Sequence, residues 1–158
     1  MPTPLPNLHD IEAAAQVVYQ SFQATPQYRW GTLSQRLGTD CWVKHENHTP
    51  VGAFKIRGGL TYFDQLRHRG EMPREVISAT RGNHGQSMGW AARAHGAACS
   101  IVVPLGNSTE KNDAMRALGV TLIEHGDDFQ AAREHAMRLA AETGAHMVPS
   151  FHKDLLRG

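Results

Sequence analysis

The stretch EVISATRGNHGQSMGWAARAHGAACSIVVP, residues 75–104, gives the clearest indication of the fold class. It begins with a β-rich run, EVISAT (75–80), and ends with a second one, CSIVVP (99–104). Between these runs a helical pattern continues to His95, and Gly96 stands where a helix would end. Strand, helix and strand in this order predict a parallel βαβ unit with a right-handed crossover.

The same pattern continues toward the C-terminus. Ser108 and Gly119 are suited to begin and end a helix, and VTLIEHG (120–126) is a third predicted strand. Asp127 or Asp128 can cap a further helix that Gly144 ends, before a fourth strand, HMVPS (146–150). The chain is therefore predicted to be an α/β protein, with a parallel twisted sheet and helices on both faces in three layers.

The first seventy residues follow a different pattern. Asn7 can cap a helix with apolar residues at helical spacing, from Leu8 to Phe22. The segments TPQYRW (25–30) and CWVKHE (41–46) are predicted to be extended, and Ala53 to about Arg67 to be helical. The charged segment HRGEMPRE (68–75), with Gly70 and Pro73, is the best candidate for a domain boundary.

Composition excludes several classes of protein. Apolar residues make up 41% of the chain, charged residues 20%, and the formal net charge is +1, without the basic excess of a nucleic-acid binder. No apolar run approaches the ~18 residues of a membrane span, and the opening MPTPLPNLHD lacks the basic and apolar regions of a secretory signal. Cys41 and Cys99 lie in strand-like contexts, which predicts buried thiols and a cytoplasmic protein.

Lys55 is the first candidate for chemistry, in TPVGAFKIRGGL (49–60). It falls in the first turn of a predicted helix, between apolar neighbours and before Gly58 and Gly59, which would open the backbone. The positive helix end and the loss of water both favour a neutral amine, as carbonyl condensation requires. The alternative is an amphipathic helix whose lysine points to solvent.

The turn after the strand 75–80 is the second candidate. Arg81-Gly82-Asn83-His84-Gly85 joins this strand to a helix, so its backbone N–H groups can bind a carboxylate or a phosphate. Gly82 and Gly85 would allow close backbone approach, and Asn83 offers an amide. The alternative is an ordinary asparagine cap with a glycine-relieved turn.

Together these stretches resemble one family. Lys44-His45-Glu46 followed by PVGAFKIRG (50–58) resembles the pyridoxal-phosphate attachment signature of serine/threonine dehydratases, in the tryptophan-synthase-β-like group of enzymes. SATRGNHGQS (78–87) resembles their Ser-x-Gly-Asn-His loop, and KNDAMRALGVTLIEHGDDFQAA (111–132) resembles a further family stretch. The resemblance covers nearly the whole chain.

The resemblance implies a role for each matched residue. Lys55 would hold pyridoxal phosphate covalently, Phe54 would pack beside it, and Asn83 would bind the 3-hydroxyl of the cofactor. The substrate carboxylate would be bound by Thr80, Gly82, Asn83 and His84. The implied reaction is β-elimination from L-threonine or L-serine, in which Lys55 removes the Cα proton and a 2-oxo acid and ammonia are released.

Arg81 departs from the family pattern, which has Ala or Ser there. An arginine is a poor base, so racemisation is not expected. Arg81 is therefore predicted to bind an additional anionic group of the substrate, such as a 3-hydroxy acidic or hydroxyectoine-derived amino acid. The alternative is that Arg81 turns outward and pairs with a surface carboxylate.

The family's glycine run for the cofactor phosphate and its partner for the pyridine nitrogen have no counterpart among these residues. The chain is therefore expected to be roughly the first half of a dehydratase and inactive alone. Residues 1–70 would be part of a large domain, 71–150 a small βα domain and 151–158 a return segment. The complete protein is expected to be a homodimer that binds a small amino acid, and neither nucleic acid nor membrane.

Three alternatives belong to other classes. A nucleotide-binding domain would fit the βαβ series, although the first turn lacks Gly-x-Gly-x-x-Gly. A metal site would use His45, Glu46 and His48, whose spacing is not a standard zinc pattern. An inactive truncation or a regulatory paralogue would fold without catalysing a reaction.

Overall fold

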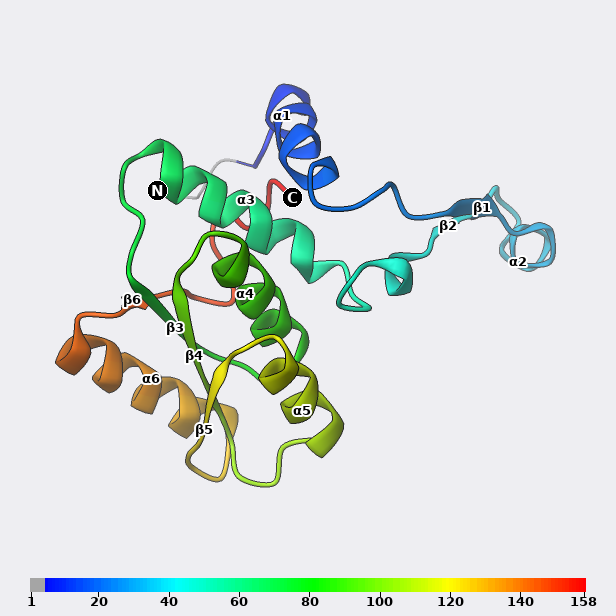
Figure 1. The fold of residues 1–158 in the computed structure, drawn as a ribbon. Helices are drawn as coiled ribbons and strands as arrows, with labels where there is room; N and C mark the ends of the chain where they lie inside the picture. The colour runs from blue at the N-terminus through cyan, green and yellow to red at the C-terminus, as the bar shows by residue number, and fades with distance from the viewer. Residues whose placement is uncertain (1–4) are drawn as a thin grey trace.

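A four-stranded parallel sheet forms the centre of the computed structural model, which describes residues 5–158. Residues 1–4 lie outside the described residues. They are the first residues of the predicted region 1–70 and of the opening segment MPTPLPNLHD. The strands are β3 (Glu75–Ala79), β4 (Ala98–Val103), β5 (Thr121–Glu124) and β6 (His146–Met147), in the order β5-β4-β3-β6 (Figure 1). The predicted parallel α/β fold is confirmed.

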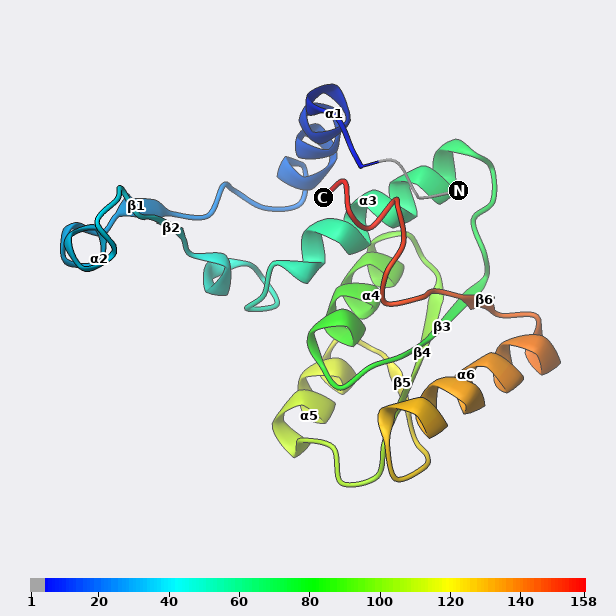
Figure 2. The ribbon, with the colours of Figure 1, turned by 180° about the vertical axis from the view of Figure 1, so that it is seen from behind.

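Helices cover both faces of this sheet (Figure 2). The helices α3 (Lys55–His68), α4 (Asn83–Ala94) and α5 (Thr109–Ala117) lie on one face, and α6 (Phe129–Thr143) lies on the other. Neighbouring strand residues alternate between the faces: Ile101 and Val103 pack toward α4 and α5, whereas Val102 packs toward α6. The three predicted layers are therefore present.

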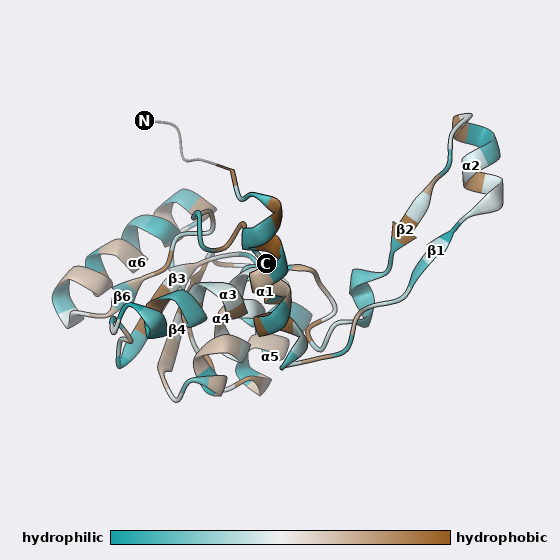
Figure 3. Ribbon diagram, turned by 90° about the horizontal axis from the view of Figure 1, so that it is seen from above, coloured by the Kyte–Doolittle hydropathy of each residue, from teal (hydrophilic) through white to brown (hydrophobic). Residues whose placement is uncertain are grey.

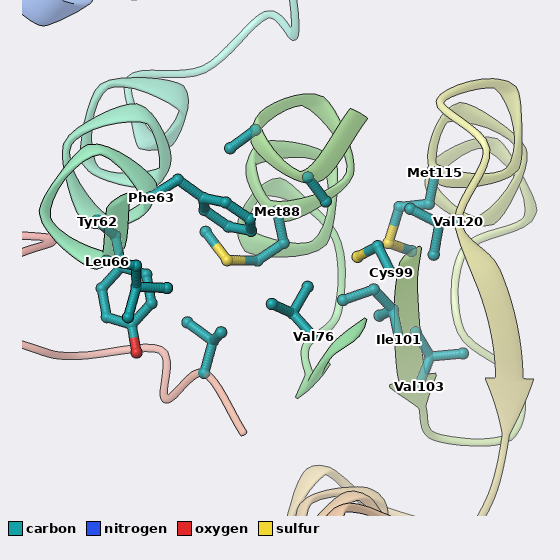
Figure 4. Packing of buried hydrophobic residues seen from close by; sticks show 13 residues of the cluster. Tyr62, Phe63, Leu66, Val76, Met88, Cys99, Ile101, Val103, Met115 and Val120 are labelled. Atoms are coloured by element: carbon teal, nitrogen blue, oxygen red, sulfur yellow. The ribbon is translucent and has the colours of Figure 1, made fainter. Parts of the chain in front are cut away.

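The larger core lies on the face that three helices share. Phe63 of α3 points toward Met88 of α4, beside Val76 and Ile101 of the strands (Figure 4). The return segment also packs on α3, because Thr61 Oγ1 donates to the Asp154 carbonyl at 2.8 Å and Arg69 pairs with the Asp154 carboxylate at 2.9 Å. Helix α3 thus shares a core with the predicted small domain, and the division at residue 70 stays a prediction.

The predicted helix ends are confirmed. Ser108 accepts a hydrogen bond from the Lys111 N–H, and Asp128 caps α6 by accepting one from Ala131. Gly96, Gly119 and Gly144 all take positive φ angles just beyond helices. Strand β6 is shorter than the predicted 146–150: Val148 still donates to Ile77, but Pro149 has no N–H with which to continue the ladder.

The N-terminal part contains a second, smaller sheet. Helix α1 (Leu8–Tyr19) has the predicted Asn7 cap, and β1 (Gln27–Arg29) pairs antiparallel with β2 (Trp42–Lys44). This pairing and the helix α2 (Gly31–Leu37) between the strands were not predicted. We call residues 26–48, which end in the 3-10 turn η1 (Glu46–His48), the arm; it extends away from the larger sheet (Figure 3).

A cluster of polar and aromatic side chains joins the arm to α3. The Arg57 guanidinium pairs with Glu46 at 2.7 Å and lies over the Phe22 ring at 5.3 Å. Thr25 Oγ1 donates to the same carboxylate at 2.6 Å.

Both cysteines are free thiols, Cys99 buried in β4 and Cys41 partly buried beside β2. No helix in residues 5–158 has the length and apolar character to cross a membrane.

Candidate active site

Lys55 lies in the first turn of α3, as predicted, but the helix begins at Lys55 and not at the predicted Ala53. A tight turn before it is closed by the buried Thr49, whose hydroxyl donates to the Ala53 carbonyl and accepts from the Ala53 N–H, both at 2.9 Å. The Lys55 side chain is half-buried, and its Nζ lies 5.4 Å from the centre of the Phe54 ring. Lys55 therefore follows a hydrogen-bonded turn, and its amine lies beside the Phe54 ring.

Helix α4 holds this end of α3 in place. Ser87 Oγ donates to the Lys55 carbonyl at 2.6 Å. A Cβ on Gly59 would collide with Ser87, and a Cβ on Gly58 would lie 2.5 Å from the Leu155 carbonyl oxygen. The expectation that this glycine pair opens the backbone is wrong: both glycines are buried, and they let α4 and the return segment approach α3 closely.

The second candidate turn follows the carboxyl end of β3. Thr80 Oγ1 accepts a hydrogen bond from the Gly82 N–H at 3.1 Å, and α4 begins at Asn83. Asn83 is the first helical residue and no side chain caps this helix, so the ordinary asparagine cap is excluded. The first N–H groups of α4 remain available to an anion. Gly85 has another role, since its missing Cβ makes room for Met115 and Thr80.

The two stretches meet in one pocket, which we call the lysine pocket. It has a volume of about 360 Å³ and lies at the carboxyl ends of β3 and β6. Its lining residues are Lys55, Ala79, Thr80, Arg81, Gly82, Asn83, His84, Lys111, Phe129 and Ser150. An adjacent pocket of about 170 Å³ shares Lys55, His84 and Ser150 and adds Phe54. All seven residues predicted for the site therefore line one of these two pockets.

Topology explains why the pocket lies here. The chain leaves β3 through α4 toward β4, and later returns through α6 to place β6 on the opposite side of β3. Because α4 and α6 cover opposite faces, the carboxyl end of β3 lies at the switch point where ligands bind in open α/β sheets. The sequence pattern alone does not contain this strand order.

His84 is the most perturbed group in the site. Its side chain is 4% exposed, and its Nε2 is buried without a hydrogen-bond partner among the described residues. Burial lowers the pKa of His84 to about 4, with a smaller contribution in the same direction from the charge of Lys55. A neutral imidazole with an unused ring nitrogen thus faces the site, which is typical of a group that a ligand completes.

Four lining residues of the lysine pocket were not predicted: Ala79, Lys111, Phe129 and Ser150. Lys111 lies in the first turn of α5, and its Cδ would be 2.7 Å from a Cβ on Gly82. The missing side chain at Gly82 allows another group to approach the backbone closely. In this fold that group is the Lys111 side chain, and a ligand is not the only explanation for the glycine. Ser150 follows β6 and could have been found only from the strand order.

The alternative metal site is not formed. Glu46 accepts hydrogen bonds from Arg57 and Thr25. No cluster of three or more metal-ligating side chains occurs between residues 5 and 158. The carboxylate that a metal would need neutralises an arginine in this fold. Arg81 is exposed at the rim of the lysine pocket, and it forms no salt bridge with the described part of the chain, so the predicted pairing with a surface carboxylate is absent there.

Comparison with curated proteins identifies relatives over most of the chain. It is 34% identical over 139 residues to a biosynthetic L-threonine dehydratase of Haemophilus influenzae, covering 88% of this chain and 27% of that protein. A biosynthetic L-threonine dehydratase of Escherichia coli is 34% identical over 134 residues, which is 85% of this chain and 26% of that protein. The chain thus spans about a quarter of the length of these relatives.

Solved structures share the fold over nearly every residue. A pyridoxal 5'-phosphate-dependent aspartate racemase matches with a TM-score of 0.90 and 26% identity, over 100% of this chain and 50% of that one. Threonine deaminase isoform 2 of Solanum lycopersicum matches with a TM-score of 0.78 and 27% identity, over 99% and 47%. The family model described as pyridoxal-phosphate dependent enzyme matches residues 18–158. The chain belongs to the family of pyridoxal-phosphate dependent enzymes.

Proposed function

We propose that the complete protein is a pyridoxal-phosphate-dependent ammonia-lyase that converts L-threonine or L-serine into a 2-oxo acid and ammonia. The observation that carries this proposal is the lysine pocket, in which Lys55 faces the uncapped start of α4. The names of the relatives, which are threonine dehydratases, support the same reaction class.

The residues present fit the aldehyde end of the cofactor. Lys55 supplies a primary amine that has no salt-bridge or hydrogen-bond partner in residues 5–158, and Phe54 lies beside it. Asn83 lines the same pocket with a side-chain amide that makes no hydrogen bond to the described residues, and the buried Nε2 of His84 also lacks a partner. Such unused polar groups around an amine suit a small ligand with several acceptors.

When bound, pyridoxal phosphate withdraws electrons from the substrate Cα and makes its proton removable. Lys55 would hold the cofactor through its amine, and the same amine, when free, would accept the Cα proton of the substrate. The first N–H groups of α4 orient the substrate carboxylate, with Thr80 fixing the turn that carries them. The β-hydroxyl departs with a proton as water, and uptake of water releases ammonia and leaves the 2-oxo acid.

A second substrate class is favoured by one observation. Arg81 lines the lysine pocket, where it can meet an additional negative charge. A 3-hydroxy acidic or hydroxyectoine-derived amino acid is therefore the second candidate.

We further propose that the complete protein is a cytoplasmic homodimer. Its binding partner is a small amino-acid substrate, and it binds neither nucleic acid nor membrane.

Reduction with borohydride tests the role of Lys55. The complete protein is loaded with pyridoxal phosphate and reduced, and the modified peptide is then mapped. We expect the pyridoxyl group on Lys55 and its loss in Lys55→Ala, together with loss of ammonia release. The variant Lys153→Ala, which changes an exposed lysine away from the lysine pocket, should keep both. Modification of Lys44, Lys111 or Lys153 in the unaltered protein would refute the assignment.

Residues 1–158 alone are still expected to turn over nothing. Steady ammonia release from threonine or serine by the purified 158-residue chain would contradict this expectation.

A further inference from the structure

The proposed reaction needs a proton for the departing β-hydroxyl, which leaves readily only when its oxygen is protonated. The amine of Lys55 takes the Cα proton in that reaction, so it does not supply this one. His84 is neutral near neutral pH, because burial lowers its pKa to about 4. Arg81 and Lys111 carry guanidinium and ammonium groups, which are in general weak acids under these conditions. None of these four side chains of the lysine pocket is suited to protonate the hydroxyl.

His152 lies in the smaller pocket that adjoins the lysine pocket. The two pockets share Lys55, His84 and Ser150, so His152 and Lys55 line the same small pocket. The His152 side chain is partly buried, with 34% of it exposed. Among residues 5–158, neither lining contains an aspartate or a glutamate. Because an imidazole gains and loses protons near neutral pH, His152 is the lining group best suited to protonate a hydroxyl.

A hydrogen-bonded turn fixes the backbone of His152. The Leu155 and Leu156 N–H groups both donate to the His152 carbonyl, at 3.0 and 3.2 Å. The same turn is tied to α3, because Thr61 Oγ1 donates to the Asp154 carbonyl at 2.8 Å. The position of His152 relative to α3 is therefore set by the protein.

Contacts with Asp154 orient the His152 ring. Nδ1 accepts a hydrogen bond from the Asp154 N–H at 3.2 Å and lies 3.7 Å from Asp154 Oδ2. The Tyr62 ring packs edge to face against the imidazole, with 5.2 Å between the ring centres. Nε2 forms no hydrogen bond with the described residues. Nδ1 is thus occupied by the protein, and Nε2 is available to a ligand.

Asp154 can stabilise both protonation states of this ring. In the neutral state Nδ1 accepts from the Asp154 N–H, and in the protonated state the carboxylate 3.7 Å away supplies an opposite charge. Arg69 pairs with the same carboxylate at 2.9 Å and offsets part of its charge. The other ionisable groups around the ring and its partners are Lys55, Tyr62, Glu71, His84 and His146. The surroundings of His152 therefore suit reversible protonation, which an acid catalyst requires.

We propose that His152 is a second catalytic residue, which protonates the departing β-hydroxyl of the substrate through Nε2. This inference rests on the proposed function and assigns one step of that reaction to a residue. Lys55 takes the Cα proton, and the electron pair left on Cα forms the Cα–Cβ double bond as the Cβ–O bond breaks. The Nε2 proton passes to the oxygen, which leaves as water, and His152 then regains a proton from solvent.

Two substrates with the same carbon skeleton test this step. L-Serine loses its hydroxyl, which needs a proton, whereas L-β-chloroalanine loses chloride, which needs none. Initial rates of 2-oxo acid release are measured with the complete, cofactor-loaded protein. His152→Gln should lower kcat for serine about 100- to 10,000-fold and kcat for chloroalanine by less than about threefold. KM for serine should change by less than about threefold, because the proton is transferred in the transition state.

His146→Gln is the matched control. The His146 ring also contacts Tyr62, but it lines neither pocket, and this variant should keep both rates. Borohydride reduction gives a readout that does not depend on turnover. His152→Gln loaded with pyridoxal phosphate should still carry the pyridoxyl group on Lys55 after reduction, which shows that the variant is folded and binds the cofactor.

The two proposals fail in different ways. Equal losses of kcat for serine and chloroalanine, or no loss for serine, overturn the acid role of His152 and leave the lyase in place. Loss of the pyridoxyl group in His152→Gln would assign this residue to cofactor binding, and the inference would then be wrong. If the unaltered protein releases 2-oxo acid from neither substrate, the lyase itself is refuted, and the role of His152 with it.

Discussion

The arm and the larger sheet use similar residues in opposite ways. Both contain short strands with apolar side chains. The apolar residues of β3 and β4, apart from Ala98, are buried between helices, whereas the arm exposes most of its own. In the arm the exposed large apolar side chains are Tyr28, Trp30, Leu33, Leu37 and Trp42. The larger sheet is thus stabilised mainly by removing apolar surface from water.

The arm depends on directional bonds instead. Arg29 pairs with Asp40 across its end at 2.6 Å. Ser34 Oγ donates to the Trp30 carbonyl at 2.8 Å and accepts from the Cys41 N–H at 2.9 Å. Each such bond contributes only about 1 kcal/mol. An apolar strand in this sequence therefore adds much stability only where helices cover it.

Truncating one aromatic residue in each region should give the largest contrast. Phe63→Ala removes a side chain that is 0% exposed in the larger core, and we expect the free energy of unfolding to fall by about 3–5 kcal/mol. Trp42→Ala removes one that is 60% exposed in the arm, and should cost less than about 1 kcal/mol. Urea unfolding of the two variants and the unaltered chain measures both values. Equal losses would mean that the arm is as well covered as the core.

Acidification should lower the free energy of unfolding through His84, which is buried beside the larger sheet. Its pKa is about 4 in the folded chain and about 6.5 when unfolded, so the unfolded state binds more protons between these values. The free energy of unfolding should therefore fall as pH falls from about 6.5 to about 4, with His84 contributing up to about 3 kcal/mol.

Comparing His84→Gln with the unaltered chain in urea at about pH 7 and about pH 4.5 isolates this contribution. We expect a smaller loss of stability on acidification in the variant, since glutamine takes up no proton. The same substitution at exposed His48 of the arm is the control for losing an imidazole. An unchanged pH dependence in His84→Gln would show that the buried ring is not the group responsible.

Substituting one glycine in each region should give the smallest difference in stability. Gly59→Ala places a methyl group against Ser87 of α4, 3.0 Å from its carbonyl oxygen, and should destabilise the chain by about 1–3 kcal/mol. Gly31→Ala, in the first turn of α2 in the arm, meets no atom within 4 Å. It should be neutral, or stabilising by up to about 1 kcal/mol. Thermal unfolding followed by circular dichroism compares them, and a tolerated Gly59→Ala would mean that α3 and α4 can separate.

Local signals in the sequence determined the elements and their chemistry. The β-rich runs of β3 and β4, the helical spacing around Met88, and caps such as Ser108 and Asp128 each depend on a few neighbouring residues. For the same reason Lys55 and the turn from Thr80 to His84 could be singled out, because a helix start and a strand-helix turn are local features. The resemblance to dehydratases joined these stretches, and family membership is confirmed.

Contacts between distant parts of the chain became known only from the three-dimensional fold. The antiparallel arm, the close contact of Gly59 with Ser87, and the approach of Lys111 to Gly82 join residues that are far apart in the sequence. The strand order β5-β4-β3-β6 places Ser150 beside the turn after β3, and leaves His84 buried with an unused nitrogen. The residues that could react were identifiable from the sequence, because reactivity begins with side-chain type and local backbone. The charges that surround these residues depend on long-range contacts, which a local sequence pattern does not predict.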